Sequence, residues 1–351
     1  MKTHNGMDFY YRLFASTFRP GPIWLRAFTW RAMLPILISS VLSVPSFASA
    51  DEKAPVAAKP IPRCQVEPLP YDQAAVLRDG GEIARYHFGH GLQRPFLFPI
   101  IGPSGRSLTR MGHPHDPNSH SHHNSVWISH HIVNGVDFWG DGKGRIEHRK
   151  VLRYADSDRE ALIEVLNAWV DPAGETLLHE ERRMRFVPLE QKQWLLVIDL
   201  KFSPPPNAKT AAVTFGKTSF GPIGVRVAKT IGVHDGGGRM LNSSGGENEQ
   251  GIFWQRAKWV DYSGPIAPAV IEGVTLMDHP TNPNHPPQFH VRDDGWMGAS
   301  LTFEGPLTVS AEKPLTVRYG LFVHAGTPPR DQLEQQFIAF TKLADSPAAK
   351  R

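Results

Sequence analysis

The sequence predicts an all-β fold, a large antiparallel β-sandwich with one C-terminal helix. Three observations predict it. Several runs alternate apolar and polar residues with a period of two, helical periodicity is almost missing, and 31 Gly and 31 Pro residues punctuate the 351-residue chain. Alternation is typical of half-buried strands, and Gly and Pro between such runs mark turns. Many strands joined by turns favour an antiparallel sandwich.

Three runs carry the alternation. They are Ala161–Trp169, Gln193–Phe202 and residues 317–323. In the second run every even position is apolar, while Asp199 and Lys201 fall on the opposite face. Each run is therefore predicted to form a strand with one face in the core.

A single helix is predicted near the C-terminus, over Arg330–Leu343. Leu333, Phe337 and Phe340 recur there at helical spacing, and Thr327-Pro328-Pro329 precedes them. Thr favours the N-cap position and Pro the first turn of a helix. We expect this helix to cover the edge of a sheet.

A secretory signal is predicted over residues 1–50. Five basic side chains and one acid precede an apolar run of 13 residues, Ala32–Val44. Ala48 and Ala50 follow it as the small residues of a cleavage site. These are the three parts of a signal peptide, and the run is shorter than the roughly 20 residues of a membrane span. We expect a periplasmic or secreted protein, free of the membrane after cleavage.

Two further segments follow the signal. Residues 51–70 are rich in Pro, Ala and charge and are predicted to be a disordered linker. Residues 71–345 are predicted to form one sandwich domain. The only cysteine, Cys64, excludes an intrachain disulfide.

The charge balance argues against nucleic acid as a partner. The chain has 38 Lys+Arg and 34 Asp+Glu, and residues beyond 50 hold 33 of each. The basic excess therefore belongs to the leader, whereas nucleic-acid binding needs a basic patch on the folded domain. We expect a small molecule or an oligosaccharide as the partner instead.

Histidines are concentrated in one stretch. Seven of the 17 lie between residues 113 and 131, among Asp and Asn residues, and two prolines interrupt the stretch. Pro excludes regular structure, so a loop is predicted, followed by a strand over Val126–Val133 and a turn at Asn134-Gly135. Polar residues clustered on a long loop indicate a functional site.

Three interpretations of this stretch remain open. One is a divalent-metal site, because imidazole and carboxylate are common ligands, although no HExxH spacing is present. Another is acid/base catalysis by His122 or His123, whose side chains should point to opposite faces of an extended chain. The third is that the histidines are structural.

A second polar cluster lies in residues 278–290, again interrupted by Pro. Loops at one end of a sandwich come together, so we expect this loop and residues 113–123 to line one pocket. Asp278 or His279 would then partner the catalytic histidine. The candidate metal ligands of the two loops are His113, His115, His285 and His290.

Aromatic and amide side chains could complete a site for a sugar, which offers C–H faces together with hydroxyl groups. Arg226 could hold a carboxylate through two hydrogen bonds. Most Trp residues belong to cores, so this assignment competes with a structural one. The candidate substrate-binding residues are Trp127, Asn134, Asp137, Trp139, Arg226, Trp259 and Asn282.

Several of these motifs occur together in one order. They are Asp116, His122-His123, Trp127, residues 133–139 (VNGVDFW), residues 259–264 (WVDYSG) and residues 278–283 (DHPTNP). In these motifs the chain resembles the bacterial PmoA-like family of unknown function. The resemblance implies a sandwich similar to that of the galactose mutarotases. Proteins similar to this family are often encoded among sugar-degrading enzymes, so the resemblance also implies a role with sugars. The family name implies a metal-dependent oxygenase.

The sequence thus predicts an exported carbohydrate-active enzyme. His/Asp acid–base chemistry would act on a sugar or glycoside by epimerisation, β-elimination or hydrolysis, with one divalent metal ion as an optional cofactor. Two other classes stay open. A metal-dependent oxygenase would require a redox metal, and a non-catalytic carbohydrate-binding protein would tolerate loss of the histidines.

Overall fold

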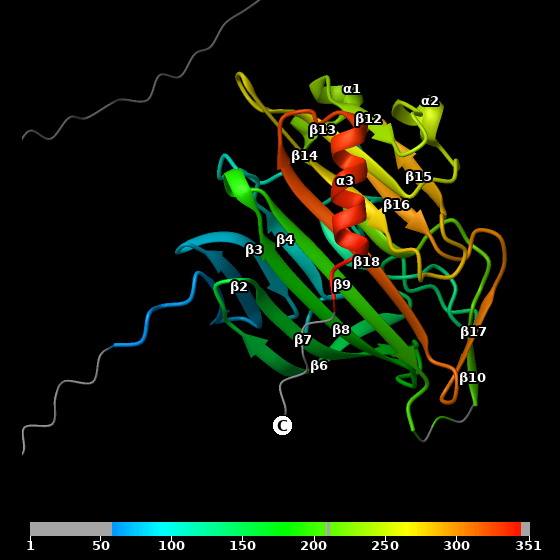
Figure 1. Ribbon diagram of the computed structural model, residues 1–351. Helices are drawn as coiled ribbons and strands as arrows, with labels where there is room; N and C mark the ends of the chain where they lie inside the picture. Colours follow the sequence, from blue (N-terminus) through cyan, green and yellow to red (C-terminus); the bar gives the residue numbers. More distant parts are fainter. Residues whose placement is uncertain (1–57, 207, 209–210, 345–351) are drawn as a thin grey trace, which may run out of the picture. The chain divides into compact units, whose positions relative to one another are not determined.

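Two eight-stranded antiparallel sheets pack face to face in the computed structural model (Figure 1). It describes residues 58–206, 208 and 211–344, so the predicted signal over residues 1–50 lies outside the described residues. The predicted β-sandwich is confirmed. None of the helices in the described part is long and apolar enough to cross a membrane.

The first sheet has the strand order β1-β2-β3-β4-β5-β11-β16-β15, and all of its pairings are antiparallel. Strands far apart in sequence therefore become neighbours at β5-β11-β16. The strands are β1 (Cys64–Leu69), β2 (Gln73–Arg78), β3 (Gly81–His87), β4 (Phe96–Ile100), β5 (Val126–Ile128), β11 (Pro222–Arg226), β15 (Gln288–Arg292) and β16 (Trp296–Ser300).

The second sheet has the order β12-β13-β14-β18-β9-β8-β7-β6, and a two-stranded sheet pairs β10 with β17. The three predicted alternating runs correspond to β7, β9 and β18, which confirms them as strands. The strands are β6 (Arg145–Ala155), β7 (Ala161–Val170), β8 (Thr176–Pro188), β9 (Trp194–Ser203), β10 (Ala212–Phe215), β12 (Arg239–Asn242), β13 (Trp259–Ala267), β14 (Val270–Asp278), β17 (Leu307–Ser310) and β18 (Leu315–Ala325).

The main core lies between the two sheets, and a second apolar cluster lies under the C-terminal helix α3 (Arg330–Thr341). Leu333, Phe337 and Phe340 of α3 are buried against the outer face of the second sheet, which the red helix crosses in Figure 1. The predicted helix is therefore confirmed. The other helical segments are short: η1 (Glu190–Lys192), η2 (Lys229–Ile231), α1 (Val233–Gly236) and α2 (Asn248–Ile252).

Two predicted boundaries are wrong. Residues 64–69 of the predicted linker form strand β1, because Cys64 and Val66 are buried and the strand pairs with β2 along its whole length. The predicted strand after the histidine loop ends at Ile128. The turn at Asn134-Gly135 forms as predicted, with positive φ angles of 46° and 79°.

Candidate functional site

A floor of aromatic rings covers the outer face of the first sheet. Trp127 on β5 and Trp296 on β16 flank β11, and Trp139 and Phe96 pack against them. The position between them on β11 is Gly224, where an added Cβ would lie 2.7 Å from the Trp127 ring and 2.8 Å from the Trp296 ring. The missing side chain therefore allows both indoles to lie flat on the sheet.

The histidine loop, residues 101–125, covers this floor. His123 packs on both indoles at once, with ring-centroid distances of 5.5 Å to Trp127 and 5.4 Å to Trp296, and the indoles are 5.3 Å from each other. Its ring is 7% exposed, and its Nδ1 atom is buried without a hydrogen-bond partner among the described residues. His122 is half-buried beside it, 4.6 Å away between centroids.

Arg94, which is 1% exposed, fixes the loop to its neighbour. Its guanidinium donates to the carbonyl of His122 at 3.2 Å and to the side chain of Asn124 at 2.8 Å. The same group donates to the carbonyls of Trp139 and Gly140, at 2.8 and 3.0 Å. One buried cation thus holds the histidine pair against the segment that carries Trp139.

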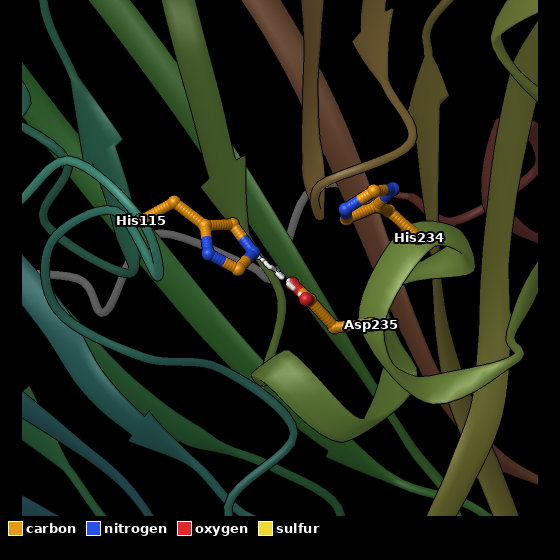
Figure 2. A group of neighbouring side chains, drawn as sticks. All are labelled: His115, His234 and Asp235. Carbon is orange, nitrogen blue, oxygen red and sulfur yellow. Dashed lines mark hydrogen bonds and ion pairs between the residues drawn. The ribbon is translucent and has the colours of Figure 1, made fainter.

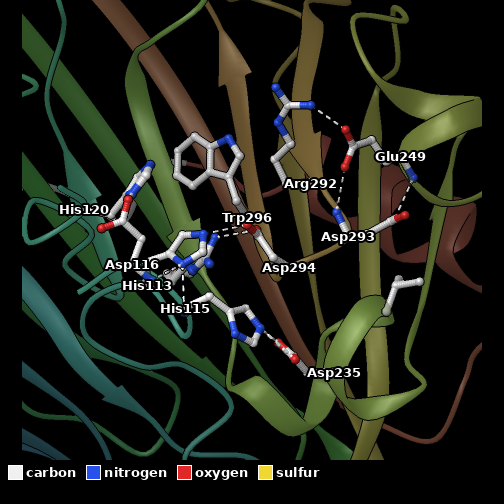
Figure 3. A network of polar contacts seen from close by, with 12 residues as sticks. His113, His115, Asp116, His120, Asp235, Glu249, Arg292, Asp293, Asp294 and Trp296 are labelled. Carbon is white, nitrogen blue, oxygen red and sulfur yellow. Dashed lines mark hydrogen bonds and ion pairs between the residues drawn. The ribbon is translucent and has the colours of Figure 1, made fainter. Parts of the chain in front are cut away.

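A second buried arginine, Arg226, is linked to the histidine loop through an aspartate. Arg226 of β11 donates to Asp294 Oδ1 at 2.8 Å, and Asp294 Oδ2 lies 2.6 Å from His113 Nε2 (Figure 3). His113 Nδ1 accepts the backbone N–H groups of His115 and Asp116, each at 3.0 Å. Nδ1 is therefore unprotonated and Nε2 donates to Asp294, so both ring nitrogens of His113 are already engaged.

Most of the other histidines in the stretch are engaged as well. His115 bonds to Asp235, His120 to Asp116, His130 to Ile132 and Thr302, and His131 to Thr218. His122 and His123 are the two of the seven whose ring nitrogens make no hydrogen bond with any described residue. This difference selects the same pair that the sequence indicates as the acid/base.

Burial sets the protonation state of this pair. It lowers the pKa of His122 to about 4, with the charge of Arg94 adding to the effect. Burial against the indoles, helped by the charge of Arg226, lowers the pKa of His123 far below its ordinary value. Both imidazoles are thus neutral near pH 7, the state in which a histidine accepts a proton or binds a metal ion.

The expectation that both polar loops line one pocket is wrong for most of the second loop. Asp278 ends β14 in the second sheet, and His290 lies on β15 in the first, so the residues between them cross from one sheet to the other. His290 does reach the aromatic floor, where its Nδ1 accepts the Trp296 indole N–H at 3.0 Å.

The remaining residues of the second loop contact one another and helix α3. Asp278 lies 2.6 Å from His285 Nδ1 and accepts from the Asn282 amide at 2.7 Å. The His285 ring stacks on Phe337 of α3, and the His279 ring meets Phe340. Asp278 and His279 thus do not partner His122 or His123.

The predicted substrate-binding residues also divide. Trp127 and Trp139 are 0% and 5% exposed, so they form the floor beneath His123 rather than an open platform. Trp259 lies under α3, where its indole N–H donates to Glu334 at 3.0 Å. Asp137 accepts the backbone N–H groups of Trp139 and Gly140 in its own turn, whereas Asn134 accepts the backbone N–H of Thr214 on β10.

One group of side chains could hold a metal ion. His115, His234 and Asp235 each offer a donor atom, and these atoms lie within 4.8 Å of one another (Figure 2). Of the four predicted metal ligands only His115 belongs to this group. His113, His285 and His290 make the separate contacts described above.

The family model described as "Family of unknown function (DUF6807)" matches residues 73–338. The chain belongs to this family. No curated protein matches the sequence. A solved structure described as "Putative kojibiose phosphorylase from human microbiome" aligns with a TM-score of 0.33 and 11% identity, over 81% of this chain and 37% of that one. The DUF6807 chain thus spans little more than a third of that protein's length.

Several site residues of this DUF6807 chain carried no recognisable signal in the sequence. Arg94 is an isolated charge before an apolar run, and His234 and Asp235 are common polar residues beside a triple glycine. Asp294 could have been noticed, because Asp294-Gly295 is a turn dipeptide between two apolar runs. Its partner His113 is 181 positions away, so the contact between them could not be predicted from the sequence.

Proposed function

We propose that this chain is an exported carbohydrate-active enzyme in which His122 and His123 exchange protons with a sugar or glycoside. One observation carries the proposal. The two are the histidines of the cluster whose ring nitrogens are free of hydrogen bonds to described residues, and they lie side by side over the aromatic floor. Buried polar atoms are nearly always paired, so the unpaired Nδ1 of His123 needs an explanation, and a functional role supplies one.

The floor would tune these groups rather than hold the sugar directly. Trp127 and Trp296 remove water from His123 and keep it neutral near pH 7, so that a ring nitrogen is available to accept a proton. Because the two imidazoles are 4.6 Å apart between centroids, a proton that one ring accepts can pass to the other and return to the substrate from there. This serves epimerisation, β-elimination and hydrolysis alike.

The rim beside His122 suits a ligand rich in hydroxyl groups. His120 and Asp116 lie on one side of it, and Asp141 bonds to Ser121 at 2.6 Å on the other. These carboxylate and imidazole edges are partly exposed and can both accept and donate hydrogen bonds. Arg226 and Asp294 would act through His113 by holding the loop in position.

The test incubates the protein with a panel of neutral sugars, uronates and glycosides in D₂O and follows the mixtures by NMR. Deuterium at a sugar carbon reports epimerisation, a new vinyl proton reports elimination, and a new anomeric signal reports hydrolysis. We expect one of these with the wild type. His122→Asn and His123→Asn should reduce the rate by about 10²–10⁴-fold, the usual contribution of an acid/base group.

His90→Asn is the matched control, because His90 is an exposed histidine outside the cluster. It should leave the rate unchanged. Saturable sugar binding without any turnover, kept in both variants, would instead identify a carbohydrate-binding protein. Equal turnover in both variants and the wild type would place the chemistry elsewhere.

We also propose export, on the strength of the leader that ends at Ala48-Ser49-Ala50. The mature N-terminus should be Asp51. N-terminal sequencing of protein from the native host measures this directly, and an intact residue 1–50 segment would contradict it.

A further inference from the structure

Two segments of the chain bring His115, His234 and Asp235 together. His115 belongs to the histidine loop, whereas His234 and Asp235 belong to α1. His115 Nε2 lies 2.7 and 2.8 Å from the two carboxylate oxygens of Asp235, and the His115 and His234 rings are 5.7 Å apart (Figure 2). Both histidines are exposed, so an ion from solution can reach them.

The backbones that carry these ligands are anchored to one turn. His113 bonds to Asp294, and its Nδ1 accepts the backbone N–H of His115 (Figure 3). On the other side the backbone N–H of His234 donates to the carbonyl of Asp293 at 2.9 Å. The 293–294 turn therefore fixes both halves of the group, which reduces the ordering that binding requires.

The donor set indicates the kind of ion. Two imidazoles and one carboxylate suit zinc and its first-row neighbours, whereas calcium and magnesium prefer oxygen ligands. Ligand bonds of about 2.0–2.2 Å place the donors of a tetrahedral ion about 3.3 Å apart. The group lies within 4.8 Å, so small side-chain rotations suffice. Lys229 Nζ lies 3.9 Å from Asp235 and must turn away when a cation binds.

We propose that His115, His234 and Asp235 bind one zinc-class divalent ion, with a coordination position left for water. The ion replaces the hydrogen bond between His115 and Asp235 and joins the histidine loop to α1. It therefore holds in place the loop that also carries His122 and His123. The site is distinct from that pair, and it stands whether or not the pair is catalytic.

The test uses chelator-treated protein at pH 7.5, with Zn²⁺ in titration calorimetry and Co²⁺ in visible absorption. We expect one Zn²⁺ per chain, d–d bands from bound Co²⁺, and a higher unfolding temperature with Zn²⁺. Affinity should fall in acidic buffer, because protonated imidazole cannot bind metal.

Two variants locate the ion, and two serve as controls. His234→Ala and Asp235→Asn should each weaken Zn²⁺ by about 100-fold or more, because loss of even a supporting group costs 10–100-fold. His90→Ala and His122→Asn should bind within twofold of wild type. No saturable binding, or binding unchanged in His234→Ala and Asp235→Asn, overturns the proposal. Loss in His122→Asn alone would place the ion in the histidine cluster and overturns it too. None of these readouts depends on sugar turnover.

Discussion

The two outer faces of the sandwich are covered in different ways. Helix α3 covers the second sheet with Leu333, Phe337 and Phe340, and the buried carboxylate of Asp261 on that face accepts from Ser263, Thr275 and His324. A loop covers the first sheet, where the buried Nδ1 of His123, Nε1 of Trp127 and Nε of Arg226 have no hydrogen-bond partner among the described residues.

This difference separates stability from function. Satisfied polar groups under an apolar helix contribute to folding, whereas buried groups without partners cost free energy. Asp199 Oδ2 on the second sheet also has no hydrogen-bond partner among the described residues, but on the first sheet such atoms surround the histidine pair, where a function can offset their cost. Substitutions on the α3 face should therefore reduce stability, and those at His122 and His123 should reduce activity.

The largest effect is expected on the α3 face. Phe340 is fully buried and packs on the backbone at Gly320, where an added Cβ would lie 3.0 Å from its ring. Phe340→Ala should lower the free energy of unfolding by about 3–5 kcal/mol. Ile338→Ala on the exposed side of the same helix should change it by no more than about 0.5 kcal/mol. Urea denaturation measures both, and equal effects would remove the distinction.

Asp278 tests whether the second polar loop is structural. Asp278→Ala leaves the partners His285 and Asn282 unsatisfied in a buried position, so we expect a loss of about 1–3 kcal/mol. His122→Asn should stay within about 0.5 kcal/mol. If Asp278→Ala retains full stability but loses turnover, the loop belongs to the site after all.

Gly224 tests the aromatic floor. Gly224→Ala forces a methyl group against the Trp127 and Trp296 rings and should cost about 1–3 kcal/mol. Gly305→Ala is the control, because nothing lies within 4 Å of its added Cβ. The near-ultraviolet circular dichroism of the indoles should change in the first variant only. An unchanged spectrum would mean that the rings do not lie on this glycine.

The last comparison concerns pH. Burial lowers the pKa of His122 and of His290 to about 4 in the folded chain, whereas both titrate near 6.5 when unfolded. Between these values the unfolded chain binds more protons, so the unfolding temperature should fall as the pH drops from about 6.5 to 4. The double variant H122Q/H290Q should show a shallower decline. An identical slope would show that these two groups do not titrate as described.

Local pattern explains why much of the fold was predictable. Strands β7, β9 and β18 alternate because each has one core face, and α3 shows its apolar spacing directly. Strand β1 escaped prediction because it offers only Cys64 and Val66 to the core, and its pairing with β2 decides the structure.

The site was predictable only in part for a related reason. His122 and His123 stood out by composition, but the expectation that they point to opposite faces is wrong, because the chain turns there and their rings lie 4.6 Å apart between centroids. The neighbours of the histidine loop depend on strand order. That order places β16 and its Asp294 turn beside β11, and it places Asp278 in the other sheet. Nothing in a local window encodes such pairings.

The histidine loop leaves the first sheet after β4 and rejoins it at β5, and these two strands are neighbours in that sheet. Because β4 pairs directly with β5, the sheet is continuous across the loop, and the loop is an insertion between the two strands of a hairpin. Lengthening such an insertion adds little to the entropic cost of closing the loop. Members of this family could therefore exchange reactive groups within residues 101–125 while keeping one scaffold, and a chimaeric loop is a practical route to new specificity.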